Sequence, residues 1–254
     1  MSARRVATAI LFTARDLLRR RVVLLMLLVV PSVFLGLTHL TTSNEPLSFL
    51  LPSLGEGRFV VVTQRAEAML FVALAAVGAL TAFLALGLGQ RDAEASWRLV
   101  LCGYRPAELV AARLALLLAV VLLVSAWVAL LVRLGFEPRG SGAMLLGLAL
   151  CGWVYAGYGL LVGALLRQEL EGVLFIVLLV NVDVGWLQNP LYYTYAQHRA
   201  LIRALPGYFP SQVGVIGAFT AYSPLRPALW ALVYGAGLAA AALLVFAWRY
   251  RERR

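Results

Sequence analysis

Residues 68–89 read AMLFVALAAVGALTAFLALGLG, a run without a charged residue. A helix rises about 1.5 Å per residue, so a run of this length covers the roughly 30 Å hydrocarbon core of a bilayer. The whole chain has the same character, because 62% of its 254 residues are hydrophobic and only 13% are charged. An ordinary soluble domain carries roughly 25% charged residues. Most of this chain is therefore expected to lie in lipid.

Four further segments are long or apolar enough to cross a bilayer, and a sixth, weaker segment holds two polar residues. The predicted spans are 22–38, 68–89, 114–132, 143–166, 173–187 and 228–247. An even number of crossings puts both termini on the same side of the membrane. We predict an all-α membrane protein with six transmembrane helices, forming one transmembrane domain over 1–254.

The basic residues indicate the orientation. All 22 are arginine, and about twice as many fall in the N-terminal segment, the loops on that side and the C-terminal tail as in the opposite loops. By the positive-inside rule, both termini are predicted to be cytoplasmic. The absence of lysine is typical of a GC-rich bacterial genome, so we expect a multi-pass protein of a bacterial cytoplasmic (inner) membrane. The net charge of +10 then reports topology and contact with membrane lipid, and no nucleic acid partner is expected.

The first 21 residues predict an amphipathic interfacial helix that leads into the first span. A cleavable signal peptide is the competing interpretation, but the basic region is long and no A-x-A site follows the apolar run. On a helical wheel one side is apolar, and it holds Val6, Ala7, Ile10, Ala14, Leu17 and Leu18.

The loop after the second span, 90–108, reads QRDAEASWRLVLCGYRPAE. It predicts a short helix that stops at Gly103, followed by a new helix that starts at Pro106. Trp97 and Tyr104 share one face of the short helix, beside a charged stripe. These aromatic residues are either interfacial anchors of a solvated loop or part of a surface for a partner protein.

The segment 189–226 is too polar to span a membrane and too apolar for a free loop. It predicts two short helices, 191–205 and 212–220, with Pro206 and Pro210 bracketing a turn between them. Short apolar helices of this kind commonly lie in the interface or re-enter the membrane. Three side chains of the segment are candidates to hold lipid phosphates or a departing anionic substrate, namely His198, Arg199 and Arg203.

These features together resemble the permease subunits of type 2 ABC transporters, the ABC-2 type exporters. The resemblance rests on the N-terminal helix, six spans with both ends inside, the stretch LCGYRPAELVAARL after the second span, and the short helices before the last. It implies a membrane-spanning permease subunit of an ATP-driven exporter, which forms the translocation path and pairs with a second copy or a related permease. Lipids, polysaccharides, peptides and drugs are all exported by this family, so the resemblance names no substrate.

The resemblance also implies that the loop after the second span is a coupling helix that docks on a separate ABC ATPase subunit. ATP and Mg²⁺ would be bound by that partner, and no cofactor is expected in this chain. The residues expected to couple to the ATPase are Arg91, Glu94, Trp97, Arg98, Leu101, Tyr104 and Arg105.

Two polar residues, Asn181 and Asp183, interrupt the fifth span. A carboxylate inside a membrane is costly and normally faces the interior of the bundle or an aqueous cavity. Asn181 and Asp183 are therefore candidates for the translocation path. The alternative is a structural hydrogen bond from Asp183 to Asn181 or to a tyrosine such as Tyr155 or Tyr158.

The motifs of several enzyme classes are missing from the sequence. Without lysine there is no Walker A site and no Schiff base, and there is no H-E-x-x-H metal site. His39 and His198 fall outside the spans, so neither can activate a serine such as Ser141 within the membrane, and a lone Asp183 cannot form an aspartyl dyad. We therefore expect no catalytic or metal site. The alternative to a permease is a non-transporting membrane assembly or structural subunit.

Overall fold

The structure, a computed structural model, describes residues 3–51, 59–90, 106–166 and 168–252. Six helices in these ranges are long and apolar enough to cross a membrane, which confirms the predicted number. The helices that contain these spans are α2 (Arg21–Thr41), α3 (Gln64–Gln90), α5 (Pro106–Gly135), α6 (Ser141–Leu165), α7 (Glu169–Val180) with its π-helical continuation η2 (Asn181–Leu187), and α11 (Leu225–Glu252). The remaining elements are α1 (Ala3–Arg19), β1 (Pro46–Leu50), β2 (Phe59–Thr63), α8 (Pro190–Tyr195), α9 (Arg199–Ala204) and α10 (Tyr208–Phe219).

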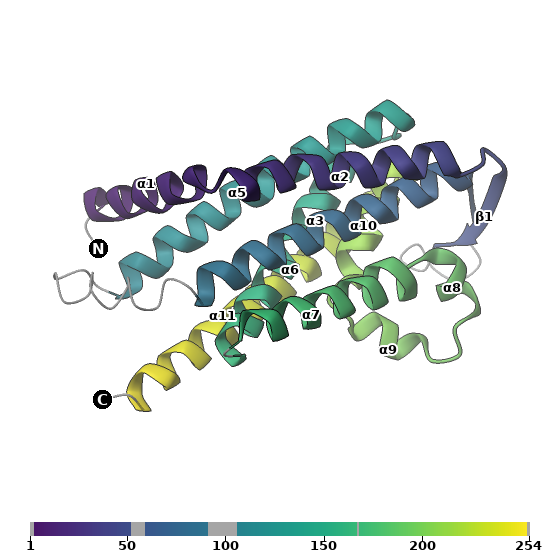
Figure 1. Cartoon of the computed structure of the whole chain (residues 1–254). Helices are drawn as coiled ribbons and strands as arrows, with labels where there is room; N and C mark the ends of the chain where they lie inside the picture. The colour runs from purple at the N-terminus through teal and green to yellow at the C-terminus, as the bar shows by residue number, and fades with distance from the viewer. Residues whose placement is uncertain (1–2, 52–58, 91–105, 167, 253–254) are drawn as a thin grey trace.

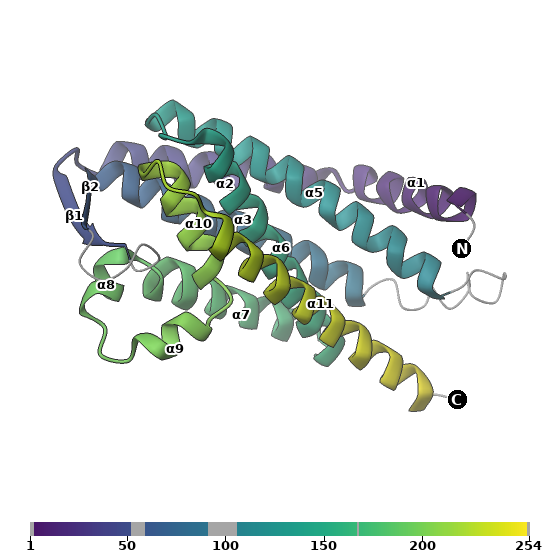
Figure 2. The same ribbon diagram turned by 180° about the vertical axis from the view of Figure 1, so that it is seen from behind.

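The elements form an elongated bundle with two different ends (Figure 1). The start of α1 and the end of α11 lie at one end, here called the termini end. The strands and the short helices α8 and α9 lie at the other, here called the hairpin end. The view from behind shows α10 and α11 on the same side of the bundle (Figure 2).

Helix α6 is the centre of the bundle and packs against α3, α10 and α11. Glycines allow these close approaches, because a Cβ added at Gly147 would meet the backbone of α10 and one at Gly157 would meet that of α11. A Cβ at Gly159 would lie 2.8 Å from Cα of Ala82 in α3. The small residues of the fourth span, Gly152, Ala156, Gly159 and Gly163, are thus accounted for by packing within this chain.

The predicted N-terminal helix is present as α1. The helix packs against α5, and it turns Ala9 inward while Leu18 is 63% exposed. Of the six residues on the predicted apolar side, Ile10, Ala14 and Leu17 are partly buried, and the position of the helix at the membrane interface stays a prediction. The chain breaks at Arg20, whose φ of −81° and ψ of 69° are not helical, and α2 begins at the next residue.

A two-stranded antiparallel hairpin, which the sequence did not predict, follows α2. Pro46 pairs with Thr63 and Leu50 pairs with Phe59. Phe49 is 1% exposed and packs edge-on against Phe219 at the end of α10, with ring centroids 6.3 Å apart. This contact fixes the hairpin to the helical bundle.

The segment before the last span contains three helices rather than the predicted two. The predicted helix 191–205 is divided into α8 and α9, because Ala196 is extended with φ −68° and ψ 131°. Asn189 caps α8 by accepting a hydrogen bond from the backbone of Leu191, and Pro190 occupies the first turn. Pro210 does not close a turn. It lies in the first turn of α10, where a missing N–H costs nothing.

Candidate functional site

Asp183 is fully buried at the hairpin end of the bundle and accepts three hydrogen bonds from side chains and backbone. The Tyr155 hydroxyl donates to Oδ2 at 2.6 Å, and the backbone N–H of Gly207 donates to the same oxygen at 2.7 Å. The Gln188 amide donates to Oδ1 at 2.7 Å. We call these four residues the Asp183 cluster.

The Asp183 cluster joins elements that are far apart in the sequence. Tyr155 belongs to α6, Asp183 to η2, and Gly207 to the turn between α9 and α10. Gln188 adds a link to α9, because Nε2 also donates to the carbonyl oxygen of Ile202 at 3.1 Å. The cluster therefore ties the chain that follows the fifth span back onto the central helix.

The local backbone explains how Asp183 reaches this position. The N–H of Gln188 bonds to the carbonyl of Asp183 at 2.9 Å, an i to i+5 contact that widens the helix into a π-turn. Such turns are often found at functional sites. Here the wider turn puts both Asp183 and Gln188 on the buried side.

Two glycines leave the space that the cluster needs. A Cβ at Gly78 of α3 would lie 2.9 Å from the ring of Tyr155, and one at Gly207 would lie 2.9 Å from Oδ2 of Asp183. A side chain at Gly207 would thus push the turn away from the carboxyl group and lengthen the N–H hydrogen bond. At both positions glycine is needed because a neighbouring residue comes close, and not because the backbone has an unusual conformation.

The chemistry of the Asp183 cluster is that of an anchor. The three partners of the Asp183 side chain are neutral hydrogen-bond donors, and an ionised carboxylate acts only as an acceptor toward them. Among the described residues, Asp183 forms no ion pair and belongs to no group of three potential metal ligands. The hydrogen bond from Tyr155 to Asp183, one of the two interpretations of this residue, is present, and a role of Asp183 in a translocation path stays a prediction.

The second predicted path residue, Asn181, lies apart from this cluster. Its side chain is exposed and donates to the carbonyl of Val177 in its own helix at 2.8 Å. Asn181 and Asp183 therefore point in different directions, and the structure does not bring them together into one path.

The predicted basic residues of the following segment hold α8 and α9 together. Arg199 donates to the carbonyl of Thr194 at 2.7 Å and lies 5.8 Å from the ring centroid of Tyr193. Arg203 donates to the Tyr193 hydroxyl at 2.9 Å. His198 is exposed and immediately precedes α9. Arg199 and Arg203 thus have partners in their own segment.

Tyr193 is the residue on which these contacts converge. It is 2% exposed and stacks on Tyr208, with ring centroids 6.1 Å apart.

Replacing Tyr193 with phenylalanine is expected to loosen α9 while leaving the ring stack in place. The lost hydrogen bond from Arg203 contributes about 1 kcal/mol, so the melting temperature in detergent should fall by about 3 °C. Trypsin should also cut after Arg203 more quickly. Tyr192→Phe is the matched control, since its hydroxyl has no hydrogen-bond partner among the described residues and its side chain is 55% exposed. Equal cutting rates in the two variants would contradict the assignment.

The two predicted prolines are both buried at the α9–α10 junction. Pro206 follows Leu205, whose extended backbone of φ −72° and ψ 150° ends α9. Pro206 and Pro210 flank Gly207 and Tyr208, so they restrict the backbone that presents the Gly207 N–H to Asp183.

The predicted coupling residues lie outside the described residues. This applies to Arg91, Glu94, Trp97, Arg98, Leu101, Tyr104 and Arg105. Only the predicted restart of the helix at Pro106 falls in a described range, and it is confirmed as the first residue of α5.

Sequence reasoning missed Gln188, Gly207 and Glu67. No sequence motif marks Gln188 or Gly207 as functional, because Gln188 follows the span and Gly207 belongs to a turn. Glu67 lies in the first turn of α3 and is 3% exposed, and its Oε1 has no hydrogen-bond partner among the described residues. Glu67 could have been noticed in the sequence, because it is a carboxylate directly before the apolar run 68–89.

In comparisons of the whole sequence with known proteins, no protein-family model and no curated protein matches this chain.

Proposed function

We propose that this chain is the membrane-spanning permease subunit of an ATP-driven exporter of the ABC-2 type. It forms the translocation path with a second permease copy or a related permease. A separate ABC ATPase subunit, which binds ATP and Mg²⁺, supplies the energy. The chain itself is not an enzyme.

The observation that carries this proposal is the buried position of α10. Its 12 residues give a length of about 18 Å, too short for a 30 Å hydrocarbon core. Every residue of α10 except Phe209 is nevertheless buried, and the helix packs against α6 and α11. We interpret α10 as a re-entrant helix, because the ABC-2 resemblance implies a short apolar helix of this kind before the final span.

The Asp183 cluster supports the same proposal because it fixes the turn that precedes α10. Because Asp183 accepts the hydrogen bond from Gly207, we expect α10 and η2 to move together. A path for substrate next to α10 would then respond to tilting of the central helix α6, which donates the hydrogen bond from Tyr155.

The arginine distribution supports an orientation in the membrane, and the absence of lysine supports a bacterial location. We place the termini end of the bundle in the cytoplasm, because the arginine-rich segments adjoin it. In this orientation α1 is an interfacial helix on the inner leaflet, and the hairpin, α8 and α9 face outward. The membrane is the cytoplasmic membrane of a bacterium.

The proposed mechanism starts at the loop between α3 and α5. Closure of the ATPase pair on ATP pushes this coupling loop, the two permease bundles tilt, and substrate leaves at the hairpin end. Trp97, Arg98 and Tyr104 transmit the motion in this proposal.

A tagged pull-down from native membranes tests the proposal directly. The protein is extracted in detergent and its copurifying partners are identified and quantified by mass spectrometry. We expect a P-loop ATPase in about equal amount. If only other membrane proteins without a nucleotide site copurify, the chain is an assembly or structural subunit and the permease proposal is wrong.

The double variant Trp97→Ala with Arg98→Glu tests the coupling loop. Loss of an aromatic anchor and reversal of a charge at a protein contact each cost a large part of its binding energy. Stimulation of the ATPase should therefore fall to the level of the ATPase alone. The control is Trp186→Ala with Arg226→Glu, which changes the same residue types at exposed positions of the hairpin end. Undiminished stimulation in the first variant would contradict the coupling assignment.

A further inference from the structure

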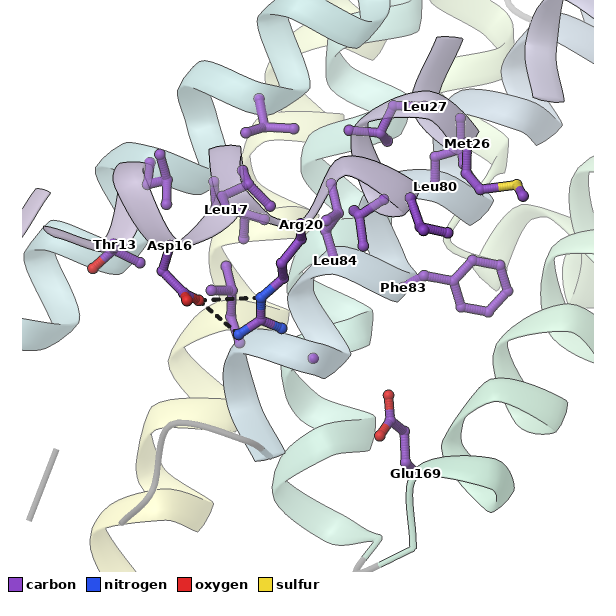
Figure 3. Close-up of a pocket in the computed structure, with 17 residues that line it drawn as sticks. Thr13, Asp16, Leu17, Arg20, Met26, Leu27, Leu80, Phe83, Leu84 and Glu169 are labelled. Atoms are coloured by element: carbon purple, nitrogen blue, oxygen red, sulfur yellow. Dashed lines mark hydrogen bonds and ion pairs between the residues drawn. The ribbon is translucent and has the colours of Figure 1, made fainter. Parts of the chain in front are cut away.

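A pocket of about 270 Å³ opens at the termini end, between α1, α2, α3, α5 and the start of α7 (Figure 3). It does not include any residue of the Asp183 cluster. Most of its lining is apolar, and it includes Leu27, Leu80, Phe83, Leu84, Leu117 and Val120.

Charged side chains line one part of this pocket. Arg20 donates from Nε at 3.1 Å and from Nη2 at 2.6 Å to the same oxygen of Asp16. Glu169 lines the pocket from α7, across from this ion pair (Figure 3). Arg20 immediately precedes α2 and Glu169 begins α7, so the charges lie where two spans enter the membrane. The apolar wall reaches from there to Leu27, about 10 Å further along the helix.

Gly87 shows that this volume is open. A Cβ added at Gly87, which lines the pocket from α3, would meet no atom within 4 Å. At Gly78 and Gly89 of the same helix, an added Cβ would meet the rings of Tyr155 and Phe246. An apolar volume offers water no polar partners, so in a membrane protein hydrocarbon is the matching occupant.

We propose that this pocket binds one acyl chain of a phosphoethanolamine lipid, with the lipid phosphate at Arg20 and its ammonium group at Asp16. The apolar wall is about 10 Å long, so the pocket holds the first part of one chain, while the rest of that chain and the second chain lie in the bilayer. A guanidinium has five N–H donors, and Arg20 uses two of them on Asp16. The others are available for a phosphate.

The charges of the pocket select this head group. Asp16 and Arg20 offer one charge of each sign where the pocket opens. A zwitterionic head group matches both charges, whereas phosphatidylglycerol brings only the anion and has no cation for Asp16. The lipid would then bridge α1 and α3. This inference does not depend on the proposed transport function.

The test measures lipid retained by the purified protein. The chain is extracted from membranes that contain phosphatidylethanolamine and phosphatidylglycerol in equal amounts, and bound lipids are counted by native mass spectrometry. We expect one phosphatidylethanolamine per chain. Gly87→Leu should lower its retention roughly tenfold, the effect of excluding about two methylene groups from a buried apolar site. Gly36→Leu is the control, because a Cβ there also meets no atom within 4 Å and Gly36 does not line the pocket.

Arg20→Met tests the head group without filling the pocket, and it also serves if Gly87→Leu does not fold. This variant keeps an apolar stem of similar length, so the preference for phosphatidylethanolamine over phosphatidylglycerol should disappear. Equal retention of phosphatidylethanolamine by Gly87→Leu and Gly36→Leu would overturn the site. Equal retention of the two lipids by the unaltered protein would overturn the head-group assignment.

Discussion

Asp183→Leu is expected to cause the largest loss of stability of any single substitution at the hairpin end. The change leaves the Tyr155 hydroxyl, the Gln188 amide and the Gly207 N–H without their acceptor. Each unsatisfied buried donor costs about 1–3 kcal/mol, so we expect a loss of about 5 kcal/mol in the free energy of unfolding. The melting temperature in detergent should fall by more than about 10 °C.

In Asp183→Leu, the segment around α9 should unfold more often than the rest of the chain, and limited proteolysis can detect this local unfolding. Without Asp183, the turn at Gly207 is no longer held to η2, and α9 opens more often than the rest of the chain. Trypsin should therefore cut faster after Arg199 and Arg203, while the rate after Arg133 of α5, which is exposed and lies outside this segment, should change little. A rate increase at all three sites alike would instead indicate global unfolding.

Asn181→Leu is the matched control for Asp183→Leu. Both residues belong to η2, but Asn181 is exposed and bonds only to the carbonyl of Val177 in its own helix. A leucine there faces lipid and leaves no buried donor without a partner. If Asp183→Leu melted at the same temperature as Asn181→Leu, the anchoring role of Asp183 would be wrong.

Asp183→Asn should fall between these variants. The amide oxygen can still accept from Tyr155 and Gly207, while the new NH₂ group faces the donor of Gln188. Gln188 can rotate its amide, because its Oε1 has no partner among the described residues. This rotation breaks the hydrogen bond from Gln188 to the carbonyl of Ile202. The net change is the loss of about one hydrogen bond, which lowers the free energy of unfolding by about 1 kcal/mol.

The number of spans could be predicted from the sequence because it depends on a local property. An apolar run either matches the thickness of the hydrocarbon core or does not, and the predicted span 68–89 lies inside α3. The hairpin was missed because its strands are five residues each and too short to give a clear alternation. Ala196 divides α8 from α9 without a proline or glycine, so the break carries no sequence signal.

The Asp183 cluster could be predicted only in part. A carboxylate in a span must find a partner, and the sequence offered Tyr155 as one candidate. Gln188 and Gly207 could not be inferred, because their positions depend on the π-turn and on the fold of the chain between α8 and α10. Contacts between residues far apart in the sequence leave no periodic pattern from which they could be predicted.

Gly159→Leu is expected to have a comparable effect at the centre of the bundle. A Cβ at this position of α6 would lie 2.8 Å from Cα of Ala82 and still closer to its carbonyl oxygen. Both atoms belong to the backbone of α3, so no side chain can rotate away, and the two helices must separate. Overpacking of a close helix contact costs about 3 kcal/mol, and the melting temperature should fall by roughly 10 °C.

Gly142→Leu on the same helix separates packing from helix propensity. A Cβ at Gly142 would meet no atom within 4 Å, and this residue lies in the first turn of α6 at the hairpin end. Replacing glycine in a helix normally stabilises it by up to about 1 kcal/mol, so this variant should melt at the same temperature or higher. The two variants should thus move in opposite directions. A Gly159→Leu protein as stable as Gly142→Leu would mean that α3 and α6 are not in close contact, and the central position of α6 would have to be abandoned.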